Sequence, residues 1–391
     1  MLKLTLDRLR ALELPLGTAW LLADCMEARG KQELWIRQKP AVLDSLREQA
    51  IIQSVESSNR LEGVTVPRER LRPVVLGQAK PRDRSEEELA GYRKALDWIF
   101  GRQAPFPVSP KTIAHLHALA QGGFSGDAGK WKERDNEIIE FSSGGERRVR
   151  FRPTAAKDVP KAMERLCASY RTELNDQAIP PLLVAGAFVF DFVCIHPFRD
   201  GNGRVSRLLT TLLLQQQGFV AGRFVSLERL VEESKVRYYE VLEECSLHWH
   251  EGRNEIVPWW NYLLTILRRG YQEFERRIES VQAPAKADLV RSAIMDRDDS
   301  FTLMDIASQC PSVSQQMVKK VLGILKNENK VQLNGRGRSA RWQRTPRELC
   351  DEQESYLSEG HTAISGSTRS AIRTGRCSAA HWIIRSFFLP K

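Results

Sequence analysis

The 391-residue chain lacks several features that would place it in a specialised class of protein. Its seven cysteines are odd in number and scattered, and no two of them form a Cys-x-x-Cys pair. This usage argues against a disulfide framework and favours a reduced, cytoplasmic setting. No apolar run reaches the roughly 20 residues that a membrane helix needs. Lys3, Asp7, Arg8 and Arg10 interrupt the first apolar residues, so we expect neither a signal peptide nor a contact with membrane.

The composition is instead typical of a soluble chain with several domains. A length of 391 residues is large for one compact core, so two or three domains are expected. The hydrophobic share of 42% fits a globular protein. The net charge of +10 permits contact with nucleic acid or acidic proteins but does not establish it.

The most informative stretch is residues 196–207, His-Pro-Phe-Arg-Asp-Gly-Asn-Gly-Arg-Val-Ser-Arg. Apolar runs at 181–195 and 208–214 flank it, and both have the length of buried helices. Gly201 and Gly203 lack a Cβ, so the backbone can turn sharply and approach a ligand closely. Their N–H groups lie where the next helix should begin, and the start of a helix attracts anions.

The side chains of this stretch add groups that suit phosphate chemistry. Asn202 supplies an amide, and Arg204 and Arg207, three residues apart, share a helix face and can hold one polyphosphate. Asp200 is a hard oxygen ligand for Mg²⁺, and His196 can accept a proton near neutral pH. No Gly-Lys-Ser/Thr follows, so the loop is not a Walker A motif. A Gly-Asn-Gly alone would indicate only a turn, but the whole cluster predicts a substrate phosphate.

Residues 196–207 resemble the signature of the Fic family, His-Pro-Phe-x-Asp/Glu-Gly-Asn-Gly-Arg-x-x-Arg, at every fixed position. The resemblance implies a mainly α-helical bundle that transfers AMP from Mg²⁺-bound ATP to a Ser, Thr or Tyr hydroxyl of a protein, itself included. It implies that His196 is the general base, that Asp200 holds Mg²⁺ and that Phe198 is a wedge in the core. The residues that it implies for ATP binding are Gly201, Asn202, Gly203, Arg204 and Arg207.

A second Fic element precedes the signature. Apolar residues at intervals of three and four predict a helix over about residues 41–63, and Gly63 suits a left-handed cap. Ser58, Glu62 and Gly63 resemble the family pattern Ser/Thr-x-x-x-Glu-Gly/Asn, whose Glu pairs with the second signature arginine, here Arg207, and obstructs ATP. A carboxylate on this arginine would compete with the γ-phosphate and repel it. The resemblance therefore implies inhibition by Glu62.

Two further regions resemble parts of Fic proteins. Residues 137–141 and 147–151 are β-prone runs around Ser-Ser-Gly-Gly, which predicts a hairpin. It falls where Fic proteins carry the flap that aligns the target segment by strand addition. Tyr238 and Tyr239 resemble a tyrosine pair beside the nucleotide base, so one of them is a candidate to stack on adenine.

The predicted domains are an N-terminal helical region (1–84), a Fic catalytic domain (85–282), a winged helix-turn-helix (283–344) and a poorly ordered tail (345–391). Residues 64–84, rich in Pro and Arg, predict a loop, and Ser85 with Glu88 predicts a capping box. Short helices at 304–307 and 315–327, followed by a strand and wing at 330–338, resemble a winged helix. Its predicted basic face consists of Lys319, Lys320, Arg336, Arg338, Arg341 and Arg344. In the tail, the apolar run 379–389 suggests a docking helix.

Several alternatives stay open. The chain could be a DNA-binding regulator with a sensory Fic domain, or a Fic enzyme that removes AMP with Glu62 positioning water. The winged helix could bind DNA or mediate protein contacts, including those of a homodimer. Fic-type kinases of the Doc group carry Lys where this chain has Gly203, which favours nucleotidyl transfer. Another nucleotide or a phosphocholine donor is not excluded, because the signature does not read the base, and the target protein is unknown.

Overall fold

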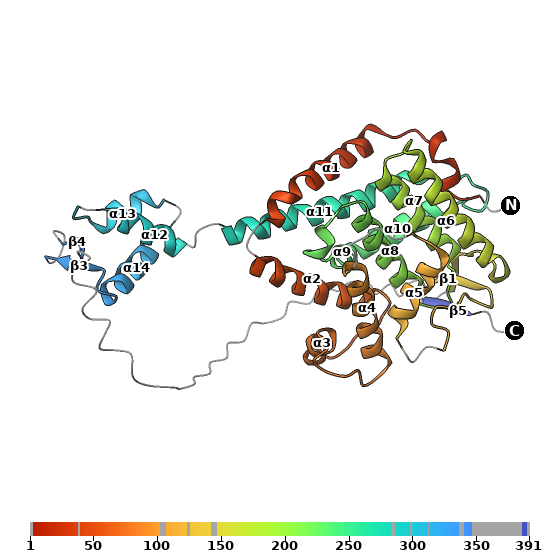
Figure 1. Ribbon diagram of the computed structural model, residues 1–391, viewed down its shortest axis with the longest axis horizontal. Helices are drawn as coiled ribbons and strands as arrows, with labels where there is room; N and C mark the ends of the chain where they lie inside the picture. Colours follow the sequence, from red (N-terminus) through yellow and green to blue (C-terminus); the bar gives the residue numbers. More distant parts are fainter. Residues whose placement is uncertain are drawn as a thin grey trace. The chain divides into compact units, whose positions relative to one another are not determined.

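The computed structural model describes residues 3–37, 40–101, 107–122, 126–141, 147–282, 286–297, 299–311, 313–335, 340–345 and 385–388. These residues are mainly helical with a few short strands (Figure 1), so the predicted fold class is confirmed. Their contacts divide them into two units, Met1–Ile278 with Ser378–Lys391, and Glu279–Cys377. None of the helices described is both long enough and apolar enough to cross a membrane.

The first unit is a helical assembly around one hydrophobic core, which includes residues from Leu4 to Ile278. The residues of the predicted N-terminal region and of the predicted catalytic domain therefore share this core. Its helices are η1 (Leu6–Ala11), α1 (Leu16–Ile36), α2 (Pro40–Leu61), α3 (Arg68–Val75), α4 (Arg84–Phe100), α5 (Pro110–Gln121), η2 (Ala156–Asp158), α6 (Val159–Asp176), α7 (Pro181–Ile195), α8 (Asn202–Gln216), η3 (Ala221–Arg223), α9 (Leu227–Glu233), α10 (Lys235–Ser246) and α11 (Val257–Gln282).

Helix α7 is almost entirely buried in this unit. Its sequence is apolar on all sides, which is typical of a buried helix. Asp191 is the exception, and its buried carboxylate accepts hydrogen bonds from the backbone of Thr5 and Leu6 and from the Trp249 indole, at 2.8–3.0 Å. Burial raises the pKa of Asp191 to about 6, although these donors oppose the shift. The carboxylate thus fastens the start of the chain to the helix that ends at His196.

Local capping explains where several helices begin and end. Ser109 caps α5, and Gly63, with φ of 78°, follows α2 in the left-handed conformation, as predicted. The predicted capping box at Ser85 is wrong, because Asp83 is the N-cap of α4 and accepts from the Glu86 N–H at 2.9 Å. The predicted loop at 64–84 is also wrong in part, because α3 forms there with Pro73 inside it.

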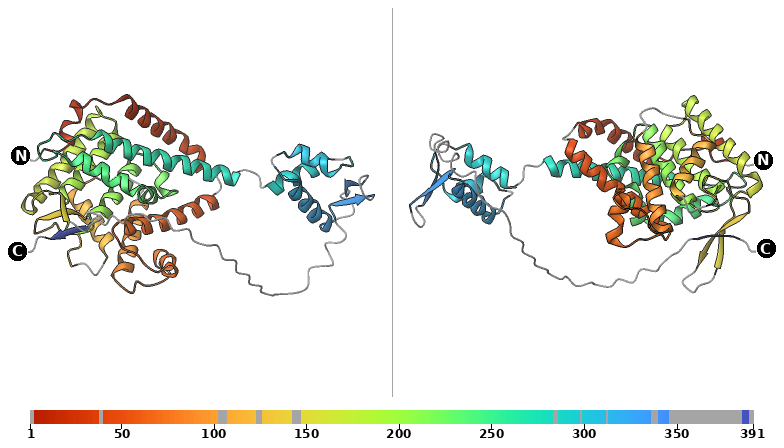
Figure 2. Two further views of the ribbon diagram at one scale, coloured as in Figure 1. Left: turned by 180° about the vertical axis from the view of Figure 1, so that it is seen from behind. Right: turned by 60° about the horizontal axis from the view of Figure 1, so that its bottom comes forward.

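The hairpin prediction is confirmed. Strands β1 (Asn136–Phe141) and β2 (Arg147–Phe151) pair antiparallel, with Ile139 opposite Val149. A third strand, β5 (Arg385–Phe388), pairs antiparallel with the other edge of β1, so the order is β2-β1-β5. Figure 2 shows β5 beside the hairpin in both views. The expected docking helix is therefore wrong for 385–388, and the rest of the predicted tail after Thr345 lies outside the described residues.

The second unit contains α12 (Lys286–Met295), α13 (Leu303–Gln309), α14 (Gln315–Asn327), β3 (Val331–Asn334) and β4 (Arg341–Arg344). Strands β3 and β4 pair antiparallel, and Phe301 forms an isolated bridge with Trp342. Of the predicted basic face, Lys319, Lys320 and Arg341 are exposed and Arg344 is half-buried. Arg336 and Arg338 lie outside the described residues.

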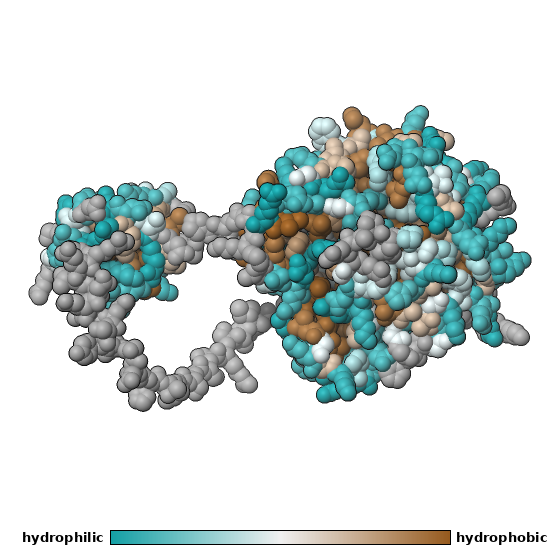
Figure 3. Space-filling view, viewed as in Figure 1, coloured by the Kyte–Doolittle hydropathy of each residue, from teal (hydrophilic) through white to brown (hydrophobic). Residues whose placement is uncertain are grey.

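Figure 3 shows a face on which hydrophilic residues predominate, with apolar patches between them. Among the described residues, exposed large apolar side chains recur along α1, namely Leu16, Trp20, Met26 and Leu34.

Candidate functional site

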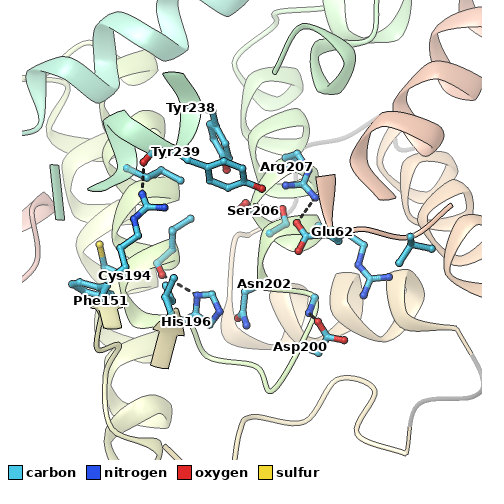
Figure 4. A pocket seen from close by; sticks show the side chains of 18 of the residues that line it. Glu62, Phe151, Cys194, His196, Asp200, Asn202, Ser206, Arg207, Tyr238 and Tyr239 are labelled. Atoms are coloured by element: carbon cyan, nitrogen blue, oxygen red, sulfur yellow. Dashed lines mark hydrogen bonds and ion pairs between the residues drawn. The ribbon is translucent and has the colours of Figure 1, made fainter. Parts of the chain in front are cut away.

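The predicted site residues gather at one cavity of the first unit, with a volume of about 530 Å³ (Figure 4). It is lined by the loop between α7 and α8 and by parts of α4, α8, α10 and the hairpin. Ser58 and Gly63 do not line it. The remaining predicted site residues line the cavity, namely Glu62, His196, Asp200, Gly201, Asn202, Gly203, Arg204, Arg207, Tyr238 and Tyr239.

His196 ends α7 in the left-handed conformation, with φ of 52°. Its Nδ1 lies 3.3 Å from the Val193 carbonyl oxygen. Donation to that carbonyl places the ring proton on Nδ1, so Nε2 carries the lone pair that a general base needs. Burial, followed by the charge of Lys132, lowers the pKa of His196 to about 3. The imidazole is therefore neutral at physiological pH and able to accept a proton.

The turn after His196 is closed by its own side chains. Asn202 Oδ1 accepts from the Phe198 N–H and its Nδ2 donates to the Phe198 carbonyl, both at 2.9 Å. The Asn202 amide therefore shapes the loop, and anion binding falls to the backbone N–H groups at the start of α8. Position 201 requires glycine, because its φ is 78° and a Cβ there would lie 2.8 Å from the Gln121 side-chain amide.

Phe198 is fully buried, as the predicted wedge should be, and it stacks on His117 with 3.7 Å between ring centroids. His117 Nε2 donates to the Asp200 carbonyl at 3.0 Å, and its Nδ1 accepts from the Gly129 N–H at 2.8 Å. Burial lowers the pKa of His117 to about 4, which keeps this bonding pattern intact near neutral pH. Sequence reasoning found no role for His117, because nothing at its own position indicates a contact some 80 residues away.

The two signature arginines have different surroundings. Arg204 is 1% exposed, and its Nη1 lies 2.8 Å from the Glu88 carboxylate while Nη2 donates to Gln121 at 3.3 Å. Among the described residues, its Nε has no hydrogen-bond partner. Arg204 is thus held by α4 and α5 with its charge already matched by Glu88.

Arg207 is held by the end of α2. Its Nε donates to the Ser58 hydroxyl at 2.8 Å, and its Nη2 donates to the Ser58 carbonyl at 2.9 Å and to Glu62 Oε1 at 2.8 Å (Figure 4). Burial opposes the charge of Arg207, yet the Glu62 carboxylate raises its pKa above the ordinary value. A Cβ on Gly203 would lie 2.1 Å from Glu62 Oε1. The Glu62 carboxylate therefore rests directly against the glycine loop.

The tyrosine pair lines the cavity beside the end of α2. Tyr238 is 5% exposed and packs against Trp259 and Tyr262, whereas Tyr239 is half-buried and its hydroxyl donates to the Leu61 carbonyl at 3.3 Å. Tyr239 is therefore the better placed of the two to contact a planar ligand. Lining residues that sequence reasoning missed are Val64, Arg84, Ser85, Glu88, Ile138, Arg150, Phe151, Phe190, Val193, Cys194, Ser206, Leu242 and Ser246.

A divalent cation would have one carboxylate here. Among the described residues no group of three His, Cys, Asp or Glu side chains could hold a metal by itself. Asp200 is half-exposed, and its Oδ1 accepts from the Gly201 N–H at 2.6 Å. A single carboxylate fits Mg²⁺ that arrives on substrate phosphates, because Mg²⁺ keeps water and phosphate oxygens as its other ligands.

Comparison with known proteins agrees with this geometry. Residues 107–214 match the model of the Fic/DOC family, so this part of the chain is a Fic domain. The chain is 24% identical over 207 residues to a protein adenylyltransferase Fic from Nematostella vectensis, and the match covers 51% of this chain and 44% of that protein. It is 35% identical over 77 residues to the protein adenylyltransferase fic-1 from Caenorhabditis elegans, covering 19% of this chain and 14% of that protein. The chain thus spans less than half the length of either relative.

A solved structure shares the fold. A Fic family protein from Desulfovibrio desulfuricans superposes with a TM-score of 0.56 at 20% identity, covering 85% of this chain and 97% of that one. At this identity the likeness is evidence for the fold alone.

Proposed function

We propose that this protein is an adenylyltransferase that moves AMP from Mg²⁺-bound ATP to a hydroxyl of a protein, and that Glu62 inhibits it. The observation that carries the proposal is the ion pair of Glu62 with Arg207, which lies in one cavity with the neutral His196 and the glycine loop. The adenylyltransferase names of the two relatives support the reaction class. The target hydroxyl belongs to a Ser, Thr or Tyr residue of another protein or of this chain.

His196 would begin the reaction. Its Nε2 takes the proton of the target hydroxyl as that oxygen attacks the α-phosphorus of ATP. A new oxygen–phosphorus bond forms, the bond from the α-phosphorus to the bridging oxygen breaks, and pyrophosphate leaves. Backbone N–H groups of Asn202 and Gly203, at the start of α8, would face the charge that develops on the phosphate oxygens, while the Gly201 N–H holds the Asp200 carboxylate, and Arg207 would attract the leaving pyrophosphate. Mg²⁺, when bound at Asp200, would neutralise part of the phosphate charge.

Glu62 would oppose the productive binding of ATP. Its carboxylate occupies the guanidinium that the outer phosphates would use and presses against Gly203. An anion brought to this place would be repelled by Glu62 and would have to displace a charge-assisted hydrogen bond. The resting enzyme is therefore expected to be slow, with the catalytic groups already in position.

Intact mass spectrometry tests the proposal. Purified wild type, Glu62→Gly and Glu62→Gly/His196→Ala are incubated with Mg²⁺ and ATP, and in a parallel arm with UTP. We expect Glu62→Gly to gain the mass of AMP on itself or on an added lysate protein, wild type to gain less, and the double variant to gain none. Absence of any nucleotide adduct in the Glu62→Gly samples would refute the proposal, and adducts with UTP alone would reassign the donor.

Two other functions give different results in the same experiment. An enzyme that removes AMP, with Glu62 positioning water, would release it from a modified protein in the wild type and lose this activity in Glu62→Gly. A DNA-binding regulator with a sensory Fic domain would do neither. We infer that the second unit is a winged helix, because its described elements are three helices followed by a hairpin. The exposed Lys319 and Lys320 on α14 favour contact of this unit with nucleic acid.

A further inference from the structure

We propose that Arg84, whose guanidinium pairs with Asp200, is a ligand of the outer phosphates of the nucleotide. This inference rests on the proposed function and adds a binding residue from outside the signature. Arg84 lines the cavity from the first turn of α4. Its Nη2 lies 3.3 Å from Asp200 Oδ2, and its Nε donates to Glu88 Oε1 at 2.8 Å.

The ion pair of Arg84 with Asp200 is weak enough for Arg84 to leave Asp200 when a ligand binds. Both side chains are at least half exposed, at 65% and 50%, and an ion pair between such exposed groups is weak. Asp200 is also the one signature carboxylate that can take a metal ion. When a cation binds to Asp200, it competes directly with the guanidinium for the same oxygen, so Arg84 loses this partner.

Glu88 keeps the displaced guanidinium at the cavity. The Glu88 side chain is only 4% exposed, and it holds Arg84 through one oxygen and Arg204 through the other. Arg84 therefore stays tethered through its Nε, and its Nη2 can turn from Asp200 to phosphate oxygens that arrive with the metal. A forked guanidinium suits that role, because it can donate two hydrogen bonds to one phosphate.

The charges on this side of the cavity support a change of partner for Arg84, from Asp200 to phosphate. Three guanidiniums, of Arg84, Arg204 and Arg207, face three carboxylates here: Arg84 pairs with Glu88 and Asp200, Arg204 with Glu88, and Arg207 with Glu62. When a metal–nucleotide complex binds, the metal takes Asp200 as a ligand and the phosphates displace Glu62 from Arg207. Arg84 and Arg207 then each lose a carboxylate partner and can turn to the phosphates, whereas Glu88 keeps its contacts with Arg204 and with the Nε of Arg84. The start of α4 adds a partial positive charge beside Arg84.

The test measures nucleotide affinity in a Glu62→Gly background, where the phosphate site is open. Arg84→Gln and the control Arg93→Gln are each added to this background. Arg93 lies on the same helix, pairs with Asp97 at 2.7 Å and does not line the cavity. Dissociation constants for ATP and for AMP, both with Mg²⁺, are measured by calorimetry, and unfolding is followed to confirm that each variant is folded.

We expect Arg84→Gln to weaken ATP about 10-fold with little effect on AMP, Arg84→Lys to weaken it less, and Arg93→Gln to leave both unchanged. Unchanged or tighter ATP binding in Arg84→Gln would overturn the inference, because Arg84 would then be only a counter-ion of Asp200. Equal losses for ATP and AMP would also overturn it, since they indicate a structural role. If the Glu62→Gly parent does not bind ATP, the proposed function fails, and this inference fails with it.

Discussion

At the scale of single residues, the chemistry of His196 depends on its surroundings more than on its type. An exposed histidine is half protonated near pH 6.5 and loses its basic lone pair below that value. Burial beside Lys132 lowers the pKa of His196 to about 3, so the neutral imidazole persists as the pH falls.

This shift predicts an unusual pH profile. In the Glu62→Gly variant, kcat/KM for adenylylation should stay nearly level from pH 8 to about pH 5.5, because a lowered pKa keeps His196 unprotonated across this range. His196→Ala should reduce the rate by about 100- to 10,000-fold and leave ATP affinity unchanged. A steady-state pH series measures this, and a loss of activity centred near pH 6.5 would contradict it.

The residues that could be predicted from sequence are those whose partners are local. His196, Asp200 and Arg207 lie within one signature, so their types and spacing alone predict a phosphate site. Glu88, Gln121 and His117 come from α4 and α5, and only folding brings them to the loop. Their own neighbourhoods in the sequence carry no sign of these contacts.

At the scale of elements, the hairpin is more enclosed than its sequence suggests. The alternation of β-prone and turn residues predicts β1 and β2, but pairing with a strand some 250 residues later cannot be seen in local patterns. Because β5 covers one edge of β1, a target segment cannot add to that edge while β5 is in place.

Deletion of residues 379–391 tests this arrangement. In the Glu62→Gly background, the deletion should raise the rate of modification of an external protein or peptide substrate several-fold, because it exposes the β1 backbone, and it should not change ATP affinity. A shorter deletion of residues 389–391, which retains β5, is the control. Equal rates in both deletions would show that β5 does not limit access of the target.

At the scale of the whole molecule, the chain joins a unit that contains a Fic domain at residues 107–214 to a second unit with its own core. That core includes Phe301, Val318 and Leu322, and the basic residues on α14 remain exposed. The change of pattern after residue 300 predicts separate elements there.

A binding series with duplex DNA tests the second unit. Lys319→Glu/Lys320→Glu should weaken binding and reduce the slope of log affinity against log salt by about 2, one for each lost phosphate contact. Lys235→Glu, an exposed lysine of the first unit, is the control and should change neither. If the double variant binds like wild type, or if wild type binds no duplex at moderate salt, the DNA contact is refuted.

The central claim is that Glu62 holds Arg207 and thereby opposes nucleotide binding, and its most direct test is ATP affinity measured by calorimetry in the presence of Mg²⁺. Glu62→Gly should bind ATP about 10- to 100-fold more tightly than wild type, since loss of a charge-assisted hydrogen bond frees the guanidinium for phosphate. Glu62→Gln should give a smaller gain, and Glu56→Gln, which removes a carboxylate paired with Arg60 on the same helix, should give none. Equal ATP affinity in wild type and Glu62→Gly would contradict the account.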